Sequence, residues 1–332
     1  MKFRTYFGLR ILTWAITIWI GVTIVFFVPR FFPSDPVDAM IGQMVSRGGQ
    51  MASEELELMR SHLRMQFGLE ASLWEQYTRF LINGLFRFDF GPSLMNFPTP
   101  ASEIIFRFLP YTLGLLLTST ILGWIIGNII GLLAGFRKNK LSSKILETVA
   151  ICLYPIPYWL VALVLQIVLG FILGLFPLRS DIFGIPGTFF WFQSLARAGA
   201  MPLISILLIN AGWWIISMKA LSSSVALEDY VLFARFRGLE EGEIGRKYVF
   251  RNSILPQITA LGLSLGGVFG GAVLVETIFG FPGVGLLMLN AIGMSDYNMI
   301  MGCVTISILA VSTATLIVDL VLPFIDPRIR YS

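Results

Sequence analysis

The residues best suited to chemistry form a charged island, 227–256, between two long apolar segments. Its first part places acids at the start, bases at the end and then a glycine, which suits the dipole and the stop of a short helix. These residues are Glu228, Asp229, Arg235, Arg237 and Gly238. A second amphipathic run over 239–252 leads back to apolar sequence. Two helices kept outside the lipid between spans predict a docking surface for a partner.

Motifs for other chemistry are missing. The sequence has no GxxxxGK[ST] phosphate loop, no HExxH and no GxSxG, so we expect neither an enzyme nor an ATP site on this chain. Cys152 and Cys303 lie inside predicted spans, and the lone His62 has no partner in the sequence. We therefore expect no disulfide framework, no metal site and no cofactor bound by the chain.

The composition is that of a membrane protein, because 56% of the residues are hydrophobic and 13% are charged. Six apolar stretches are long enough to span a bilayer. They cover residues 11–29, 111–136, 147–176, 201–218, 257–277 and 300–322. The predicted fold class is an all-α polytopic membrane protein with six transmembrane helices.

Charge predicts the orientation. The connection 137–144 carries four bases and no acid, whereas 278–299 carries Asp296 as its one charge. The positive-inside rule then places both termini, 137–144 and 219–255 in the cytoplasm. All six lysines fall on that side, so the net charge of +4 reflects topology and does not indicate nucleic-acid binding.

This topology divides the chain into four parts. They are 1–29, the N-terminus and first span; 30–110, an extracytoplasmic segment; 111–322, a transmembrane core with the cytoplasmic loop 219–256; and 323–332, a cytoplasmic tail.

The extracytoplasmic segment is expected to contain two helices. Ser53 and the acids after it predict a helix near 53–66. A second helix is predicted over 71–86, with an apolar stripe that either packs against the spans, lies at headgroup level or contacts a ligand. The stripe is Trp74, Tyr77, Phe80, Leu81 and Leu85.

Glycines recur at intervals of four residues in two spans, which is typical of tightly packed membrane helices. The second span has Gly123, Gly127, Gly131 and Gly135, and the fifth has Gly262, Gly266 and Gly270. A smooth face along which helices slide is the alternative.

Polar residues inside the spans are few. Such residues form interhelical hydrogen bonds or touch a polar substrate, and both interpretations stay open. The candidates for lining a pathway are Asn128, Gln166, Asn210 and Glu276. Their scarcity counts against an ion-coupled carrier, which needs ionisable groups for its relay.

Glycines and a proline interrupt the apolar sequence at 276–285, which predicts a re-entrant element at the outer mouth or an ordinary outer loop. That element contains Phe281, Pro282, Gly283 and Gly285.

Several motifs, in order along essentially the whole chain, resemble those of one family. PSDPV at 33–37 is similar to its PGDPV, and FDFGPS with FRFLPYTL is similar to its DFGxS and RLPxTL. EDYVLFARFRGL followed by RNSILP, then ETIFGFPGVG and the closing DPRIRY, match further segments. The chain thus resembles permease subunits of binding-protein-dependent ABC importers of the oligopeptide/dipeptide type. Leu232 and Phe233 depart from the general EAA consensus of such loops, as members of this branch do.

The resemblance implies a coupling helix that docks on a cytoplasmic ATPase and rocks the spans between outward and inward states. The positions carried over for coupling are Glu228, Asp229, Ala234, Arg235, Arg237, Gly238, Leu239, Leu255 and Pro256, the last two starting the return into the membrane. It further implies a second homologous permease in a heterodimer, two ATPase subunits that bind ATP and Mg²⁺, and an extracytoplasmic solute-binding protein. The location implied is the cytoplasmic (inner) membrane of a prokaryote.

The substrate class stays open between peptides and oligosaccharides, since Trp159, Trp191, Trp213 and Trp214 are of a type that stacks on sugar rings. Two other classes are more remote. A secondary carrier transports without ATP, and a membrane sensor uses 30–110 to bind a ligand and 227–256 to signal, without net flux.

Overall fold

The computed structural model describes residues 3–31, 37–38, 41–42, 45, 53–66, 69–136, 141–267 and 272–325. Its secondary-structure elements are all helices, and the β pairing in these residues is one isolated bridge between Pro92 and Pro100. The predicted all-α architecture is therefore confirmed.

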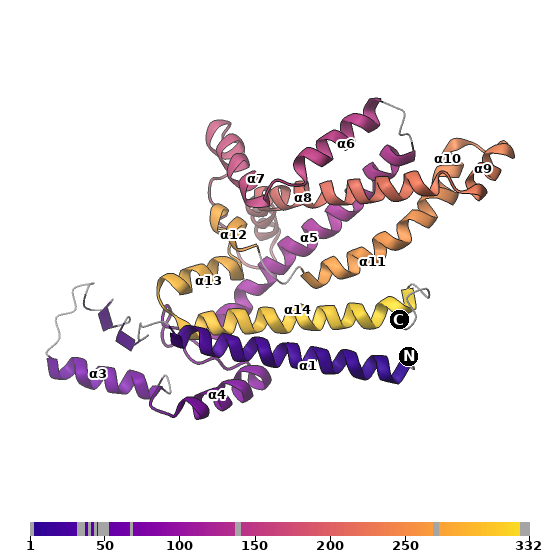
Figure 1. Ribbon diagram of the computed structural model, residues 1–332. Coiled ribbons are helices and arrows are strands. Elements are labelled where there is room, and N and C mark those ends of the chain that lie inside the picture. The colour runs from indigo at the N-terminus through magenta and orange to yellow at the C-terminus, as the bar shows by residue number, and fades with distance from the viewer. Residues whose placement is uncertain are drawn as a thin grey trace.

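Four helices in the described residues are long and apolar enough to cross a membrane. They are α1 (Phe3–Phe27, extended by a 3-10 turn to Phe31), α5 (Ala101–Phe136), α8 (Phe189–Val225) and α14 (Tyr297–Ile325). Two bent helix pairs raise the number of spans to six if each pair counts as one. In Figure 1, α1 and α14 lie side by side, while α5 and α8 form the other half of the molecule.

Two of these helices are longer than the apolar stretches that predicted them. Helix α5 begins at Ala101 instead of 111, and α8 covers 189–225 instead of 201–218. Apolar sequence marks the part of a helix that lies in lipid, whereas backbone hydrogen bonds continue the helix into water. Pro110 and Pro202 lie inside these helices.

The third predicted span, 147–176, is not a single helix. It consists of α6 (Leu141–Leu153) and α7 (Tyr158–Leu165, continued by a π-helical segment to Ile172), which meet at 101°. Pro155 and Pro157 stand between them. Proline lacks the N–H that a helix needs and disfavours helical backbone in the residue before it, which accounts for the break.

The fifth predicted span, 257–277, is likewise not one helix. Helix α11 (Arg251–Gly267) stops ten residues short of 277, and α12 (Val273–Phe279) begins beyond the undescribed residues 268–271. Helix α10 (Glu241–Ile244), a π-helical segment (Gly245–Phe250) and α11 follow one another directly. Pro256 therefore lies inside a helix and does not begin one.

The glycines of α5 let its backbone approach that of α8. A Cβ added at Gly123 would lie 3.2 Å from Cβ of Asn210, and one added at Gly131 would lie 2.6 Å from the carbonyl oxygen of Ile215. The prediction of tight packing is confirmed for this stripe. In the second stripe, Gly262 faces Val318 of α14 at 3.2 Å, and Gly266 and Gly270 fall outside the residues whose surroundings are described.

The buried apolar residues form two main clusters. One joins α1, α4 (Leu73–Ile82), α14, the start of α5 and α13 (Val284–Gly293) around Phe26, Ile105 and Met299. The other joins α5, α7, α8 and α12 around Leu116, Met201 and Phe279. Helix α5 contributes to both clusters and so connects the two halves.

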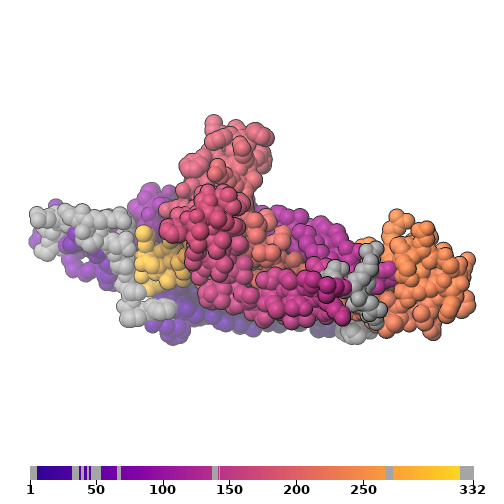
Figure 2. Space-filling model, turned by 90° about the horizontal axis from the view of Figure 1, so that it is seen from above, coloured from indigo at the N-terminus to yellow at the C-terminus, as the bar shows by residue number. Residues whose placement is uncertain are grey.

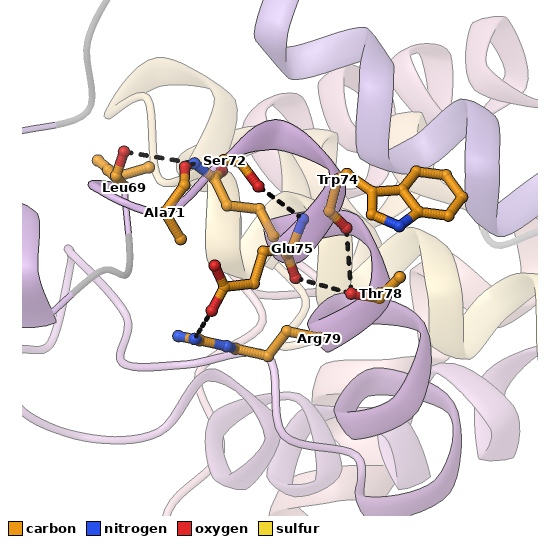
Figure 3. Close-up of polar contacts among 8 residues, drawn as sticks. Leu69, Ala71, Ser72, Trp74, Glu75, Thr78 and Arg79 are labelled. Atoms are coloured by element: carbon orange, nitrogen blue, oxygen red, sulfur yellow. Dashed lines mark hydrogen bonds and ion pairs between the residues drawn. The ribbon is translucent and has the colours of Figure 1, made fainter.

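The segment between α1 and α5 contains both predicted helices, α3 (Ser53–Gln66) and α4 (Leu73–Ile82, continued by a π-helical segment to Arg87). Figure 3 shows how α4 begins: Ser72 Oγ accepts a hydrogen bond from the backbone N–H of Glu75, and Glu75 pairs with Arg79 at 3.0 Å. These contacts cap the exposed N-terminus of α4 and support its first turn.

The apolar stripe of α4 packs mainly against the membrane helices. Tyr77 and Phe80 are buried against Phe26 of α1, and the hydroxyl groups of Tyr77 and Thr23 lie 2.7 Å apart. Trp74 lies at the outer edge of this contact, with its ring centroid 5.7 Å from that of Tyr77, and is 72% exposed. The packing interpretation is therefore confirmed for the inner residues of the stripe.

Candidate functional site

The charged island forms a helix that ends where the sequence predicts. Helix α9 (Asp229–Phe236) has Glu228 as its N-cap, and Gly238 follows its C-cap with φ of +79°. That left-handed conformation strains residues with a Cβ, which explains the glycine stop. In Figure 1, α9 and α10 lie at the same end of the molecule as the N and C labels. Figure 2 shows them as a lobe, coloured orange, at one tip of the molecule.

The lobe is held by its own small core. Val231 and Ala234 on the inner side of α9 are buried with Ile244 of α10 and Val249 of the π-helical segment. Phe136 at the end of α5 packs against the same cluster. Helix α9 is thus fixed to the ends of the membrane helices, so a force applied to it passes to α5, α8 and α11.

The outer side of α9 is apolar and exposed. Phe233 is 71% exposed and Phe236 is 86% exposed, and Leu227, Tyr230 and Leu232 extend the patch. Grouped exposed aromatic residues at a polar end of a membrane protein mark a protein-binding surface. Partial burial and the neighbouring Glu228 raise the pKa of the Tyr230 hydroxyl above its ordinary value.

The two arginines at the end of α9 differ in their contacts. Arg235 forms an ion pair with Glu241 at 2.9 Å and lies over the ring of Phe136, so it links α9 to α10 and to the end of α5. Arg237 is exposed and is available to a partner. On the second helix, hydrogen bonding to Lys247 lowers the pKa of the Glu243 carboxyl group.

The four candidate pathway residues have different surroundings. Gln166 donates hydrogen bonds to the carbonyl oxygens of Leu178 and Ile278, which connects α7 to α12. Asn128 is buried and donates to the carbonyl oxygen of Trp124 in its own helix. Asn210 faces a cavity of about 440 Å³ between α5, α6, α7, α8, α11 and α12.

Glu276 is fully buried and holds the turn between α12 and α13, which meet at 83°. Its carboxylate accepts hydrogen bonds from the hydroxyl of Thr112 at 2.7 Å and from the backbone N–H groups of Gly285 and Leu286 at 2.7 and 3.2 Å. Gly283 lies directly against this carboxylate, so a larger residue has no room there. Both carboxylate oxygens of Glu276 are thus used in hydrogen bonds within the protein.

The interrupted segment 276–285 therefore has a defined internal structure. Phe281 is buried beside Tyr111 of α5, and Gly283 caps α13 in extended conformation. Pro282 lies between them, where it cannot remove a helical hydrogen bond. The bend has the shape of a broken span or a re-entrant loop. Its place at an outer mouth stays a prediction.

Several cavity residues escaped the sequence prediction. Tyr154 and Tyr158 line the cavity from either side of the α6–α7 bend, and Thr120 lines it from α5. The signal for the two tyrosines was the pair of prolines between them, because a broken helix in apolar sequence often borders a cavity.

Comparison with known proteins gives the family. Residues 127–331 match the family described as binding-protein-dependent transport system inner membrane component. The oligopeptide transport system permease protein of Bacillus subtilis is 33% identical over 96% of each chain. The dipeptide transport system permease protein of Lactococcus lactis is 28% identical over 95% of each chain. The glutathione transport system permease protein of Escherichia coli is 28% identical over 97% of each chain.

The family match includes the whole lobe around α9, the glycine stripe of α5 from Gly127 onward and the Glu276 turn. The relatives extend the similarity to almost the entire chain, with 95% and 96% of its residues covered. The chain therefore belongs to the family of inner membrane components of binding-protein-dependent transport systems.

Proposed function

We propose that this chain is the pore-forming permease subunit of an ATP-driven importer that moves oligopeptides or dipeptides by alternating access. The relatives named above are permeases for dipeptides, oligopeptides and glutathione, which are all peptides. None of these three is a sugar permease, and no feature of the part of the chain that the structure describes favours the oligosaccharide alternative over a peptide.

The observation that carries the proposal is the exposed aromatic face of α9, mounted on a lobe that is rigidly joined to the membrane helices. A surface that transmits the movement of an ATPase must be exposed, so that the ATPase can bind it, and must be rigidly connected to the membrane helices. Phe233 and Phe236 insert into a groove of the ATPase, with Arg237 at the rim. ATP and Mg²⁺ are bound by the ATPase subunits, and this chain has no catalytic role.

The proposed orientation puts α9 and both termini in the cytoplasm and the α3–α4 segment on the outside of the inner membrane. The lysines at 144, 219 and 247 lie near the α9 end of their helices, as the positive-inside rule requires. A second, homologous permease completes the pathway as a heterodimer. A solute-binding protein delivers the peptide to the outer face.

The test uses proteoliposomes that hold this chain with its partner permease, its ATPases and its binding protein. ATP on the ATPase side should drive accumulation of a labelled tripeptide. The variant Phe236→Asp should insert normally but lose co-purification of the ATPase and at least about tenfold in uptake, because an interface hot spot contributes 2 kcal/mol or more. Phe86→Asp is the matched control, since Phe86 is 80% exposed near α4.

Two results would contradict the proposal. Uptake driven by an ion gradient without ATP would identify a secondary carrier. Full ATPase binding and uptake by Phe236→Asp would show that the aromatic face of α9 is not the docking surface.

A further inference from the structure

The polar side chains inside the membrane region fall into two groups. Some are used within the protein: Gln166 donates to two carbonyl groups, Gln257 donates to Ser217 and Trp124 donates to the carbonyl oxygen of Gln257. These contacts join helices and leave little capacity for a ligand. Others make no side-chain hydrogen bond to any residue that the structure describes; they include Thr305 of α14, which is buried elsewhere, and a set of five: Thr120, Tyr154, Tyr158, Asn210 and Trp213.

This set of five converges on one place. All five side chains line the cavity of about 440 Å³ that is bordered by α5, α8 and the α6–α7 bend. A polar group without a partner is costly in a membrane, and five of them around one space point to a ligand that provides the partners. The volume lies in the range of small-molecule sites.

The chemistry of the lining is neutral. None of the described residues that line the cavity is an aspartate, glutamate, lysine, arginine or histidine. Asn210 offers both a donor and an acceptor, which matches one peptide group, and the two tyrosine hydroxyls add further donors and acceptors. The indole of Trp213 is 38% exposed and meets the ring of Trp214 edge to face, so it presents an apolar surface next to these polar groups.

We propose that this cavity binds an uncharged, amide-bearing segment of the transported peptide during its passage. Asn210 pairs with a main-chain amide, Tyr154 and Tyr158 hydrogen-bond to neighbouring peptide groups, and Trp213 packs against an apolar or aromatic side chain. The inference rests on the proposed function, because it names the contacts that a peptide makes in the pathway. The cavity selects for peptide bonds and for an aromatic side chain, and it discriminates weakly between charges.

The position of the cavity suits a transient site. Tyr154 and Tyr158 stand on opposite sides of the 101° bend, so movement of α6 against α7 changes their separation. Asn210 lies on α8, beside Gly123 of the α5 stripe. A ligand held by α7 and α8 would be bound differently in two arrangements of these helices, and such differential binding is what coupling requires.

The experiment measures kcat for uptake by the complete transporter in proteoliposomes, at saturating concentrations of binding protein loaded with one tripeptide. The probes are Ala-Ala-Ala, Ala-Phe-Ala, Ala-Lys-Ala and Ala-Glu-Ala. Asn210→Leu should lower kcat about 3- to 10-fold for all four peptides, because each loses one hydrogen bond. Trp213→Ala should lower it at least about 3-fold more for Ala-Phe-Ala than for Ala-Ala-Ala. Tyr158→Phe should lower kcat by a smaller, charge-independent factor.

Controls separate this proposal from folding and from the proposed function. Trp19→Ala is the matched change at a 55% exposed position on α1, and it should leave all four rates unchanged. ATPase activity stimulated by the loaded binding protein shows that each variant is assembled. Wild-type uptake that depends on ATP supports the proposed function by itself. Variants of Asn210 and Trp213 that transport all four peptides at the wild-type rate would overturn the cavity proposal alone, as would a loss confined to Ala-Lys-Ala or Ala-Glu-Ala.

Discussion

The carboxylate of Glu276 on α12 accepts a 2.7 Å hydrogen bond from the hydroxyl of Thr112 on α5, and the two residues are 164 positions apart. The same hydroxyl accepts a hydrogen bond from the backbone N–H of Val284 at 2.8 Å, so its own proton is directed to Glu276. One hydroxyl and one carboxylate thus satisfy three N–H groups at the N-terminus of α13. The bend between α12 and α13 is joined to α5 through these contacts.

Replacement of Glu276 tests this network. All the groups that contact the carboxylate are donors, and Glu276→Ala leaves them buried without an acceptor, at a cost of about 3 kcal/mol. Glu276→Gln turns an amide N–H₂ toward one donor and should cost about half as much. We expect the Tm of the purified complex to fall in the order wild type, Gln, Ala. Glu103→Ala removes a 60% exposed carboxylate from the start of α5, and its Tm should match the wild type. A Tm for Glu276→Ala equal to that of Glu103→Ala would contradict the assignment.

The packing of α5 on α8 gives a second prediction, with its control on the same helix. A Cβ at Gly131 would lie 2.6 Å from the carbonyl oxygen of Ile215 and 2.8 Å from Cβ of Met218, whereas nothing lies within 4 Å of a Cβ at Gly114. Gly131→Ala should destabilise the chain by about 1–3 kcal/mol through overpacking. Gly114→Ala should be neutral or stabilising, because alanine is the better helix former. Thermal unfolding of both variants in the same detergent compares their stabilities. Equal Tm values would show that α5 and α8 admit the added methyl group at Gly131 without loss of stability.

Much of the local structure follows from the sequence. The acids, the bases and Gly238 predicted the bounds of α9 within one or two residues, because dipole and stop signals act locally. The prediction of α3 had the same basis in Ser53 and the acids after it. The repeat from Gly123 to Gly135 predicted a close helix contact, since packing of small residues needs no knowledge of the partner.

The errors arose where an apolar run does not specify direction. The run 147–176 reads as one span, yet Pro155 and Pro157 bend it by 101°, and hydropathy contains no information about angles. Asn128, Gln166 and Asn210 looked equivalent in sequence. Their different roles depend on which backbone carbonyl lies within reach, and that is decided by tertiary packing. Glu276 was expected near a pathway, but its capping contact needs Thr112, which no local pattern connects to it.

The left-handed residue at the end of α9 gives the last prediction. Gly238 has φ of +79°, and nothing lies within 4 Å of a Cβ built there, so Gly238→Ala introduces backbone strain without a clash. The strain of about 1–2 kcal/mol corresponds to a 5- to 30-fold smaller population of the docking conformation of α9. We expect normal insertion but fewer peptides imported per ATP hydrolysed. Gly242→Ala on α10 is the control, because Gly242 has ordinary helical backbone and equally open surroundings. Measuring uptake and ATP hydrolysis in the same proteoliposomes gives the coupling ratio. A ratio for Gly238→Ala equal to that of Gly242→Ala would show that the conformation at the end of α9 does not control coupling.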